Sequence, residues 1–387
     1  MKRKLLAITL IVVLALSLAA CGNNDETVTV PGTENGDNGF DGQVHHWRSQ
    51  TFTAPGTLYH FFHVSFADKV REMSGGRIDI EVFGAGELVG VNDQPAAVRD
   101  GIIDAAMMAT SVWGIERGAP LFSSTPGLFT NPMDHLMWLE FGGGFELWRE
   151  MTDRFNVRTL PIVITHAENF LWANTAIRSI EDLQGLNIRM MPLGGEILDR
   201  NGVGVVFMPG GEIVPAIERA VLDGGEFATS SMDITLGFHD VAQYVHKPGW
   251  HQPSLMLEIS INGDRWNALS PDLQRIVEVA SRASTIWSLQ YSAVRDAEAE
   301  VQFIANGNEI VVLTPQILAT LNEWANEFWV EVEAEDDFIR RIRASQKNFM
   351  QWWVPNRAML HIAYPEWVWD RQDDIPFALT PGVGARW

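Results

Sequence analysis

The sequence predicts an α/β protein built as two lobes of similar units, with long helices near its C-terminus. From residue 44 onward, segments with apolar residues at helical spacing alternate with strand-like segments, which is typical of a largely parallel sheet flanked by helices. Residues 97–106 and 216–225 share one pattern, in which a helix end, two apolar residues and an aspartate precede small residues. Beyond residue 255, a serine or threonine that directly precedes a proline indicates the start of a long helix.

The elements of the first lobe follow from apolar periodicity. Residues 57–76 have helical spacing and end in two glycines, which predicts a helix. Residues 77–83 alternate with the period of a strand, residues 94–102 return to helical spacing, and residues 103–109 indicate a buried strand.

The second lobe is expected to begin near Glu168. Ser179 suits a helix N-cap, with Asp182 three residues later, and this short helix leads to a strand that ends at Arg189. A helix that starts at glycines and a further strand then lead to Glu226.

Two long helices are expected at the end of the fold. Ser270-Pro271 and Thr314-Pro315 each place a capping hydroxyl before a proline at the first helical position, which predicts helices over about 271–305 and 315–350. Their aromatic residues indicate core packing or a subunit contact more often than ligand binding.

The first 43 residues contain a predicted export signal and a tether. A basic start, an apolar run and small residues before Cys21 describe a signal peptide over residues 1–20. The small-residue box resembles a bacterial lipoprotein processing site, in which Cys21 would carry the lipid. Residues 21–43 are polar, glycine-rich and acidic, as in a flexible tether. An uncleaved anchor is the alternative, and either way the bulk of the chain lies outside the cytoplasmic membrane.

These observations predict a division of the chain. Lobe I comprises residues 44–165 and 255–294, and lobe II comprises residues 166–254 and 295–376 with the helical C-terminal region. Residues 377–387 form a tail.

The net charge of the chain argues against two kinds of partner. The chain has 28 basic and 49 acidic residues and a net charge of −21, which argues against nucleic acid or anionic lipid as the main partner. A small anionic ligand remains compatible with a locally basic pocket. The single cysteine rules out an intramolecular disulfide.

Catalytic motifs are absent from the sequence. It contains no GxSxG elbow, HExxH helix, phosphate loop or GxGxxG after a strand, and we expect no enzyme activity. His246 and His251 lie five residues apart in a loop, which is not a regular zinc-ligand pattern, so we expect no transition-metal site there.

Two charged residues stand at the ends of matching strands. Arg189 lies among apolar residues, with no acidic residue between 183 and 195, and a buried guanidinium requires an anionic partner. Its planar donors match a carboxylate ligand, and a salt bridge to another segment is the alternative. Glu226 is expected to orient a ligand hydroxyl, bind a cation or pair with Arg189.

Four segments together resemble a known family. Residues 86–105, 181–198, 208–227 and 244–253 (GELVGVNDQPAAVRDGIIDA, EDLQGLNIRMMPLGGEIL, MPGGEIVPAIERAVLDGGEF and YVHKPGWHQP) are similar to solute-binding proteins of tripartite ATP-independent periplasmic (TRAP) transporters. The resemblance covers roughly residues 50–300 and is strongest to the branch for 2-oxo acids and related monocarboxylates.

The resemblance implies a periplasmic-binding-protein-like fold, with two lobes joined by hinge strands, braced by a long helix and separated by a ligand cleft. It implies a lipid-anchored receptor that delivers a small carboxylate, such as pyruvate or lactate, to a TRAP permease. Arg189 would clamp the ligand carboxylate. The membrane would be contacted only through the lipid anchor, and no organic cofactor is expected.

In that branch a cation bridges protein and ligand, and the matching positions here are Glu168, Glu226, the carbonyl of Phe227, and Gln252. The ligand would contact Glu168 as well. The family pattern has glutamine at position 168, glutamate at 252 and tryptophan at 227. Oxygen ligands fit Na⁺ or Ca²⁺, and two carboxylates favour Ca²⁺.

Aromatic side chains are expected to complete the cleft, and Trp47, Trp113 and Trp250 are the candidates, although each equally suits a lobe core. The aromatic C-terminal helix suits a homodimer contact, and a monomer is equally compatible.

Two other functions remain open on the sequence. A carbohydrate-binding lipoprotein is motivated by 15 tryptophans and an acidic surface. An extracytoplasmic hydrolase would use a carboxylate pair such as Glu168 and Glu226.

Overall fold

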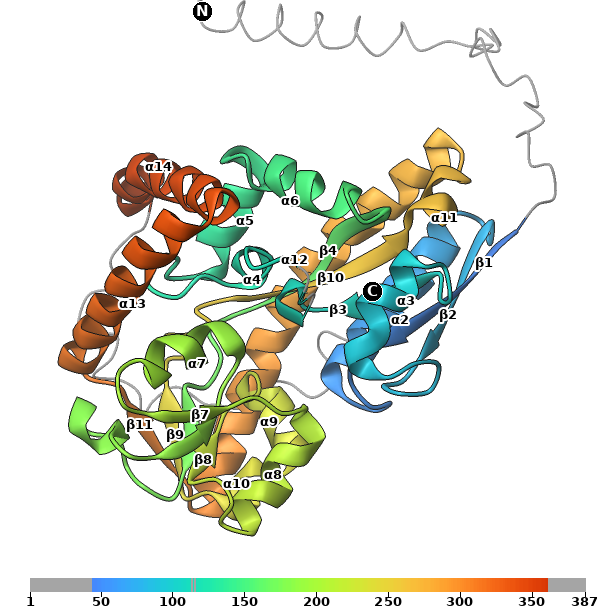
Figure 1. Cartoon of the computed structure of the whole chain (residues 1–387). Coiled ribbons are helices and arrows are strands. Elements are labelled where there is room, and N and C mark those ends of the chain that lie inside the picture. The colour runs from blue at the N-terminus through green and yellow to red at the C-terminus, as the bar shows by residue number, and fades with distance from the viewer. Residues whose placement is uncertain (1–43, 113, 115, 361–387) are drawn as a thin grey trace, which may run out of the picture. The chain divides into compact units, whose positions relative to one another are not determined.

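Two mixed sheets organise the chain in the computed structural model, which describes residues 44–112, 114 and 116–360 (Figure 1). The first sheet has the strand order β2-β1-β3-β10-β4, and the second has the order β11-β9-β5-β8-β6-β7. We call the first sheet and its helices lobe I, and the second sheet and its helices lobe II. The predicted two-lobe α/β architecture is confirmed. The strands of lobe I are β1 (His45–Thr51), β2 (Ile78–Phe83), β3 (Ala105–Met108), β4 (Val157–Thr165) and β10 (Leu255–Asn262), and those of lobe II are β5 (Leu171–Ala173), β6 (Asn187–Arg189), β7 (Gly204–Val206), β8 (Gly224–Gly225), β9 (Tyr244–Lys247) and β11 (Glu309–Val312).

Helices pack on both sheets. Those of lobe I are α2 (Leu58–Met73), α3 (Gln94–Arg99), α4 (Pro120–Ser123), α5 (Pro132–Phe141), α6 (Gly144–Asp153) and α11 (Gly263–Asn267), with the 3₁₀ turns η1 (Val91–Asp93) and η2 (Thr110–Val112). Those of lobe II are η3 (Ile180–Leu183), α7 (Pro192–Asp199), α8 (Gly210–Glu218), α9 (Ser230–Leu236) and α10 (Phe238–Val241). Three long helices follow, namely α12 (Pro271–Asn306), α13 (Pro315–Glu335) and α14 (Asp337–Leu360).

The two sheets repeat one local topology. In lobe I, β1 pairs in parallel with β2 and β3, and β10 is antiparallel to β3. In lobe II, β6 pairs in parallel with β7 and β8, and β5 is antiparallel to β8. The sequence repeat falls on the equivalent units α3–β3 and α8–β8. Parallel neighbours end at the same sheet edge, so the residues that end β6 and follow β8 lie side by side.

The chain crosses between the sheets at β4–β5, at β9–β10 and along α12. The helix α12 contacts β4 and α2 of lobe I and also α9 and β11 of lobe II, which fits the expected brace. Each of the two loop crossings connects a strand of the first sheet to a strand of the second, so their residues lie where the lobes meet.

Most of the predicted elements are present, with one helix divided. The Asp182 carboxylate accepts the N–H groups of Arg178 and Ser179 at 2.9 and 2.8 Å, as the predicted cap requires. The expectation of one helix over 315–350 is wrong, because the backbone breaks at Asp336. Its carboxylate accepts the N–H groups of Phe338 and Ile339, each at 2.9 Å, and so caps a second helix.

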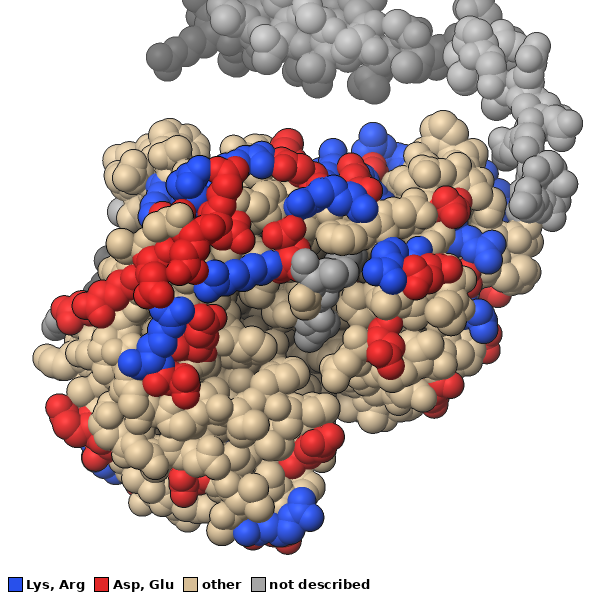
Figure 2. Space-filling view, in the orientation of Figure 1, with Lys and Arg blue, Asp and Glu red and all other residues tan. Residues whose placement is uncertain are grey.

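The C-terminal helices contact both lobes, although we expected them to pack with lobe II. The helix α13 contacts α7, but α14 packs on α5 and α6 of lobe I. Trp353 of α14 donates a 2.8 Å hydrogen bond to Asp134 of α5, and Arg357 forms an ion pair with the same carboxylate. Figure 2 shows charged side chains gathered over α6, α13 and α14, whereas lobe II has few charges on this face.

Several expectations concern residues outside the described part of the chain. The signal peptide over 1–20, Cys21, the tether over 21–43, Trp113 and the tail over 377–387 all lie there. Within residues 44–360, none of the described helices combines the length and the apolar character that crossing a membrane requires.

Candidate ligand and metal site at the crossings between the sheets

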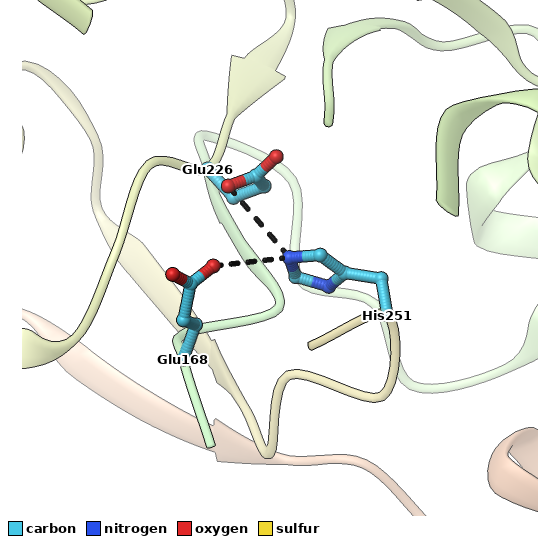
Figure 3. Close-up of side chains that lie close together, drawn as sticks. All are labelled: Glu168, Glu226 and His251. Atoms are coloured by element: carbon cyan, nitrogen blue, oxygen red, sulfur yellow. Dashed lines mark ion pairs between the residues drawn. The ribbon is translucent and has the colours of Figure 1, made fainter. Parts of the chain in front are cut away.

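Two glutamates and a histidine meet where the lobes join. Glu168 lies in the β4–β5 crossing, Glu226 directly follows β8, and His251 lies in the β9–β10 crossing. Figure 3 shows the His251 ring directing Nε2 at both carboxylates, and this atom lies 3.5 Å from Glu168 Oε2 and 3.6 Å from Glu226 Oε2. Glu168 and Glu226 are 0% exposed and His251 is 1% exposed, so the whole cluster is shielded from solvent.

Backbone contacts hold the histidine loop against Glu168. The Gly249 N–H donates to the Glu168 carbonyl oxygen at 2.7 Å, and the Glu168 N–H donates to the Gln252 carbonyl oxygen at 3.1 Å. The loop passes close to α7 as well, since a Cβ atom on Gly194 would lie 2.6 Å from Cβ of His251. Glycine at these two contacts allows the close approach that brings His251 to the glutamates.

Arg189 ends β6 beside the same cluster and is fixed by several contacts. Nη1 donates to the carbonyl oxygen and Oε1 of Glu226 at 2.7 and 3.0 Å, and Nε donates to the Met208 carbonyl oxygen at 3.1 Å. The rings of Phe207 and Phe227 lie 5.2 and 5.7 Å from the guanidinium carbon. The chain thus supplies an anionic partner for Arg189 that is distant in sequence, which is one of the roles left open for Glu226.

One end of the guanidinium remains available. Arg189 Nη2 donates to the sulfur of Met191 at 3.5 Å, which is its hydrogen-bond contact among the described residues. A thioether is a weak acceptor, so these N–H groups are suited to a carboxylate that enters from outside.

Several buried polar atoms lack partners. Among the described residues, hydrogen-bond partners are missing for both carboxylate oxygens of Glu168, Oε2 of Glu226, both ring nitrogens of His251 and Oε1 of Gln252. The His251 contacts at 3.5 and 3.6 Å are ion pairs that are too long for good hydrogen bonds. Buried polar groups in native proteins are usually satisfied, so this concentration indicates a site for a ligand or an ion.

The cluster has strongly shifted acid–base equilibria. Burial raises the pKa of Glu168 to about 7, against the opposing effect of His251. Burial also acts to raise the pKa of Glu226, but Arg189 and His251 outweigh it and hold that pKa below its ordinary value. Burial acts to lower the pKa of His251, whereas Glu226 and Glu168 raise it to about 9. A cation that entered the cluster would therefore compete with protons.

The donor set fits a metal ion. One ligand atom each from Glu168, Glu226 and His251 lies within 4.8 Å of the others. Two ligands about 2.1 Å from a tetrahedral ion are about 3.4 Å apart, close to the observed separations of Nε2 from the carboxylates. Carboxylate oxygen and imidazole nitrogen are both ordinary metal ligands in proteins.

A small cavity opens beside His251 and Gln252. It has a volume of about 20 Å³ and is lined by residues of both lobes, namely Ser111, Pro120, Ser123 and Ser124 of lobe I and Met191, Pro192, Leu193 and Gly194 of lobe II. The hydroxyls of Ser111 and Ser124 are buried without a hydrogen-bond partner in the described residues. The cavity holds about one water molecule, so a larger ligand requires the lobes to move apart.

The tryptophans proposed as cleft walls have different positions. Trp250 is packed in the hydrophobic core, and its Nε1 donates to Asn322 of α13 at 2.8 Å. Trp47 lies in the core of lobe I and also lines a separate surface pocket with His46 and Arg265. Both positions agree with the alternative expectation, in which these tryptophans belong to the core of a lobe. Trp113 lies outside the described residues.

Sequence reasoning missed the position of His251 beside the two glutamates. The expectation that the two loop histidines hold no metal rested on their mutual spacing, but the structure combines His251 with Glu168 and Glu226 from other segments. His246 is separate, since its ring contacts the Ile177 N–H at 2.9 Å and the Leu171 carbonyl oxygen at 2.8 Å. Ligand spacing along the chain is informative only when the ligands share one segment.

Comparisons with known proteins show the family of the chain. The model of the bacterial extracellular solute-binding proteins, family 7, matches residues 49–336. A monocarboxylate 2-oxoacid-binding periplasmic protein of Nostoc sp. is 30% identical over 284 residues, which cover 73% of this chain and 78% of the relative.

Two solved structures show the same fold. A TRAP periplasmic solute-binding protein of Colwellia psychrerythraea with bound calcium and pyruvate has a TM-score of 0.77 and 25% identity, covering 82% of this chain and 99% of that chain. A second, from Pseudoalteromonas atlantica with bound sodium and pyruvate, has a TM-score of 0.77 and 24% identity, covering 85% of this chain and 99% of that chain.

Proposed function

The chain belongs to family 7 of the bacterial extracellular solute-binding proteins, and from this premise we propose that it captures a small carboxylate for a TRAP permease. The proposed ligand is a 2-oxo acid such as pyruvate or a 2-hydroxy acid such as lactate. The family consists of binding receptors that act outside the cytoplasm, and not of enzymes, which removes the hydrolase alternative.

The observation that carries the proposal is the Nη2 end of Arg189, which lies beside the buried glutamates and donates only to the sulfur of Met191. Nη2 offers donors to one carboxylate, while Phe207, Phe227 and Glu226 hold the guanidinium in place. A preorganised donor loses little conformational entropy on binding, and the absence of water strengthens the ion pair between Arg189 and the ligand carboxylate.

A bridging cation completes the proposed site. Glu168 and Glu226 would hold it, with the carbonyl of Phe227 and the side chain of Gln252 as further oxygen ligands. Bound there, the cation would supply positive charge to the carboxylate and the 2-oxo or 2-hydroxy oxygen of the ligand. The two solved relatives carry calcium and sodium, so Ca²⁺ and Na⁺ are the ions implied by similarity.

Both lobes contribute polar groups to the proposed site. Ser111 and Ser124 reach the cavity from lobe I. The Tyr59 hydroxyl of α2 is buried, and both its burial and the charge of Glu168 raise its pKa, so it lies within electrostatic reach of the cluster. Closure of the lobes around a ligand would bring these hydroxyl groups into contact with it.

Two further parts of the proposal concern assembly. Cys21 would carry the lipid anchor, and the tether over residues 21–43 would let the receptor reach the permease. A homodimer through the C-terminal helix is supported by exposed apolar side chains on α14, where Trp352 is 59% exposed.

The carbohydrate alternative receives no support from the tryptophans buried in the cores, and Trp352 of α14 is the exposed one among the described residues. A sugar-binding surface requires exposed aromatic rings, but four of the largest fully buried side chains are Trp47, Trp138, Trp148 and Trp172.

Titration of the purified protein tests the proposal. Tryptophan fluorescence and calorimetry would follow pyruvate, lactate and longer 2-oxo acids in calcium, in sodium and after chelation. We expect saturable one-to-one binding without turnover, and loss of affinity in Arg189→Lys, which keeps the charge but loses the planar donors. Arg178→Ala, on the surface of lobe II, is the control. A protein that binds none of these acids in any of the ions contradicts the proposal.

A further inference from the structure

The donor set of the cluster includes a nitrogen atom. His251 Nε2 is the atom that approaches both carboxylates, and it has no hydrogen-bond partner in the described residues (Figure 3). Its position is fixed by the loop contacts of Gly249 and by the close approach of Gly194. The three atoms therefore surround a position that an ion could occupy, with Nε2 directed at it.

Imidazole changes which ion such a site prefers. Ca²⁺ and Na⁺ are hard ions that bind oxygen ligands, and Ca²⁺ takes six to eight of them. Zn²⁺ and its neighbours in the first transition row accept imidazole and carboxylate together, and Zn²⁺ is satisfied by three protein ligands and one open position. Two glutamates and one histidine provide those three ligands. A carboxylate oxygen of the bound solute would take the fourth.

The charges of the buried groups also favour a dication. An imidazole that binds a metal must be neutral, and in that state two ionised glutamates and Arg189 leave one net negative charge in a site that is closed to solvent. A monovalent ion would bring this sum to zero and leave the ligand carboxylate uncompensated. A divalent ion with a neutral imidazole leaves one positive charge, which a monocarboxylate neutralises.

We propose that His251 is a metal ligand together with Glu168 and Glu226, and that the ion in this chain is a first-row transition dication of the Zn²⁺ type. This inference rests on the proposed cation-bridged carboxylate site and specifies its metal. It keeps Glu168 and Glu226 as ligands and puts His251 in place of the oxygen ligands from Phe227 and Gln252. It departs from the calcium and sodium of the solved relatives. It also replaces the expectation that His251 takes no part in a transition-metal site.

A different use of His251 competes with this proposal. The imidazole could stand between the glutamates as a cation in its own right and so take the place of the metal ion. That arrangement predicts no metal uptake, and it leaves Arg189 as the remaining cationic group that a carboxylate could contact in the cluster. Metal binding separates the two arrangements.

The test uses the purified, chelator-stripped protein without a histidine tag. Calorimetry with Zn²⁺, Ca²⁺ and Na⁺ would measure affinity, and the visible absorption of Co²⁺ would report its ligand geometry. We expect one Zn²⁺ per chain, bound at least about 100-fold more tightly than Ca²⁺, and a tetrahedral Co²⁺ spectrum. His251→Gln is expected to weaken Zn²⁺ binding by at least about 100-fold, whereas His46→Gln, an exposed histidine, should leave it unchanged.

A second measurement does not depend on the variant folding. X-ray absorption of the zinc-loaded protein should show one imidazole nitrogen among oxygen ligands. Tighter binding of Ca²⁺ than of Zn²⁺, or a zinc spectrum without imidazole, overturns the inference. If pyruvate or lactate still binds in that case, the proposed function survives. If zinc binds through His251 but no carboxylate binds, the metal site is supported and the proposed receptor function is contradicted.

Discussion

Gly249 lies directly against Glu168, with its N–H donating to the Glu168 carbonyl oxygen at 2.7 Å. A Cβ atom on Gly249 would lie 2.5 Å from that oxygen, closer than side chains tolerate. The contact sets the distance between the histidine loop and the first glutamate, and so it sets the geometry of the cluster.

Gly249→Ala is therefore expected to disturb the site and the fold together. The backbone must shift to relieve the overlap, which should cost about 1–3 kcal/mol of unfolding free energy. Urea unfolding and metal titration would both register the change. Gly211→Ala is the matched control, because a Cβ atom there meets nothing within 4 Å. Equal behaviour of the two variants would show that the loop adapts without strain.

Removal of the Arg189 side chain should destabilise the protein far more than removal of an exposed arginine. Arg189→Ala leaves Glu226 as a buried carboxylate without its ion pair, which costs about 3–5 kcal/mol. Arg178→Ala removes an exposed pair with Glu309, whose side chains are 63% and 48% exposed, and should cost less than about 1 kcal/mol. Chemical unfolding of both variants checks the difference, and similar losses would mean that Glu226 finds another partner.

The strand ends that carry Arg189 and Glu226 could be predicted from sequence, because periodicity locates strands and the internal repeat indicates matching positions. The ion pair between them stayed one of several options, since a local pattern does not say which side chains meet across strands. His251 was missed for a related reason, as its partners come from two other segments. The break at Asp336 was missed because apolar residues at helical spacing continue on both sides of it.

The tryptophans show another limit of sequence reasoning. Large aromatic side chains serve equally well in a core and in a ligand cleft, and composition cannot separate the two uses. The structure places Trp47 and Trp250 in packed cores, whereas the polar groups that lobe I directs at the cavity beside His251 are serine residues. Serine residues carry no distinctive signal, so these positions could be found only from the fold.

Acid should destabilise the protein through a histidine that is not part of the proposed metal site. His63 of α2 is buried and contacts Ser49 Oγ at 2.9 Å, and burial together with the charge of His60 lowers its pKa from 6.5 to about 3. Its folded pKa lies below its unfolded value, so its stabilising contribution is complete above pH 6.5 and is lost as pH falls toward 3.

Between about pH 6 and pH 4, this group should lower the unfolding free energy by about 1.4 kcal/mol per pH unit. Urea unfolding across that range measures the slope. His63→Gln should reduce the slope, whereas His46→Gln, which removes an exposed imidazole, should not. An unchanged slope in His63→Gln would mean that His63 is not neutral in the folded protein.

The serine hydroxyls of lobe I should contribute to ligand affinity without contributing to stability. Ser124 Oγ is buried beside the cavity and has no hydrogen-bond partner in the described residues, so Ser124→Ala removes no contact of the ligand-free protein. A hydrogen bond that forms only with the ligand is worth about 0.5–1.5 kcal/mol, so the variant should bind the carboxylate about 2- to 13-fold more weakly, with unfolding unchanged or slightly more costly. Ser65→Ala on α2, whose hydroxyl accepts from Lys69, controls for the substitution itself. Full affinity in Ser124→Ala would show that the Ser124 hydroxyl makes no hydrogen bond to the ligand.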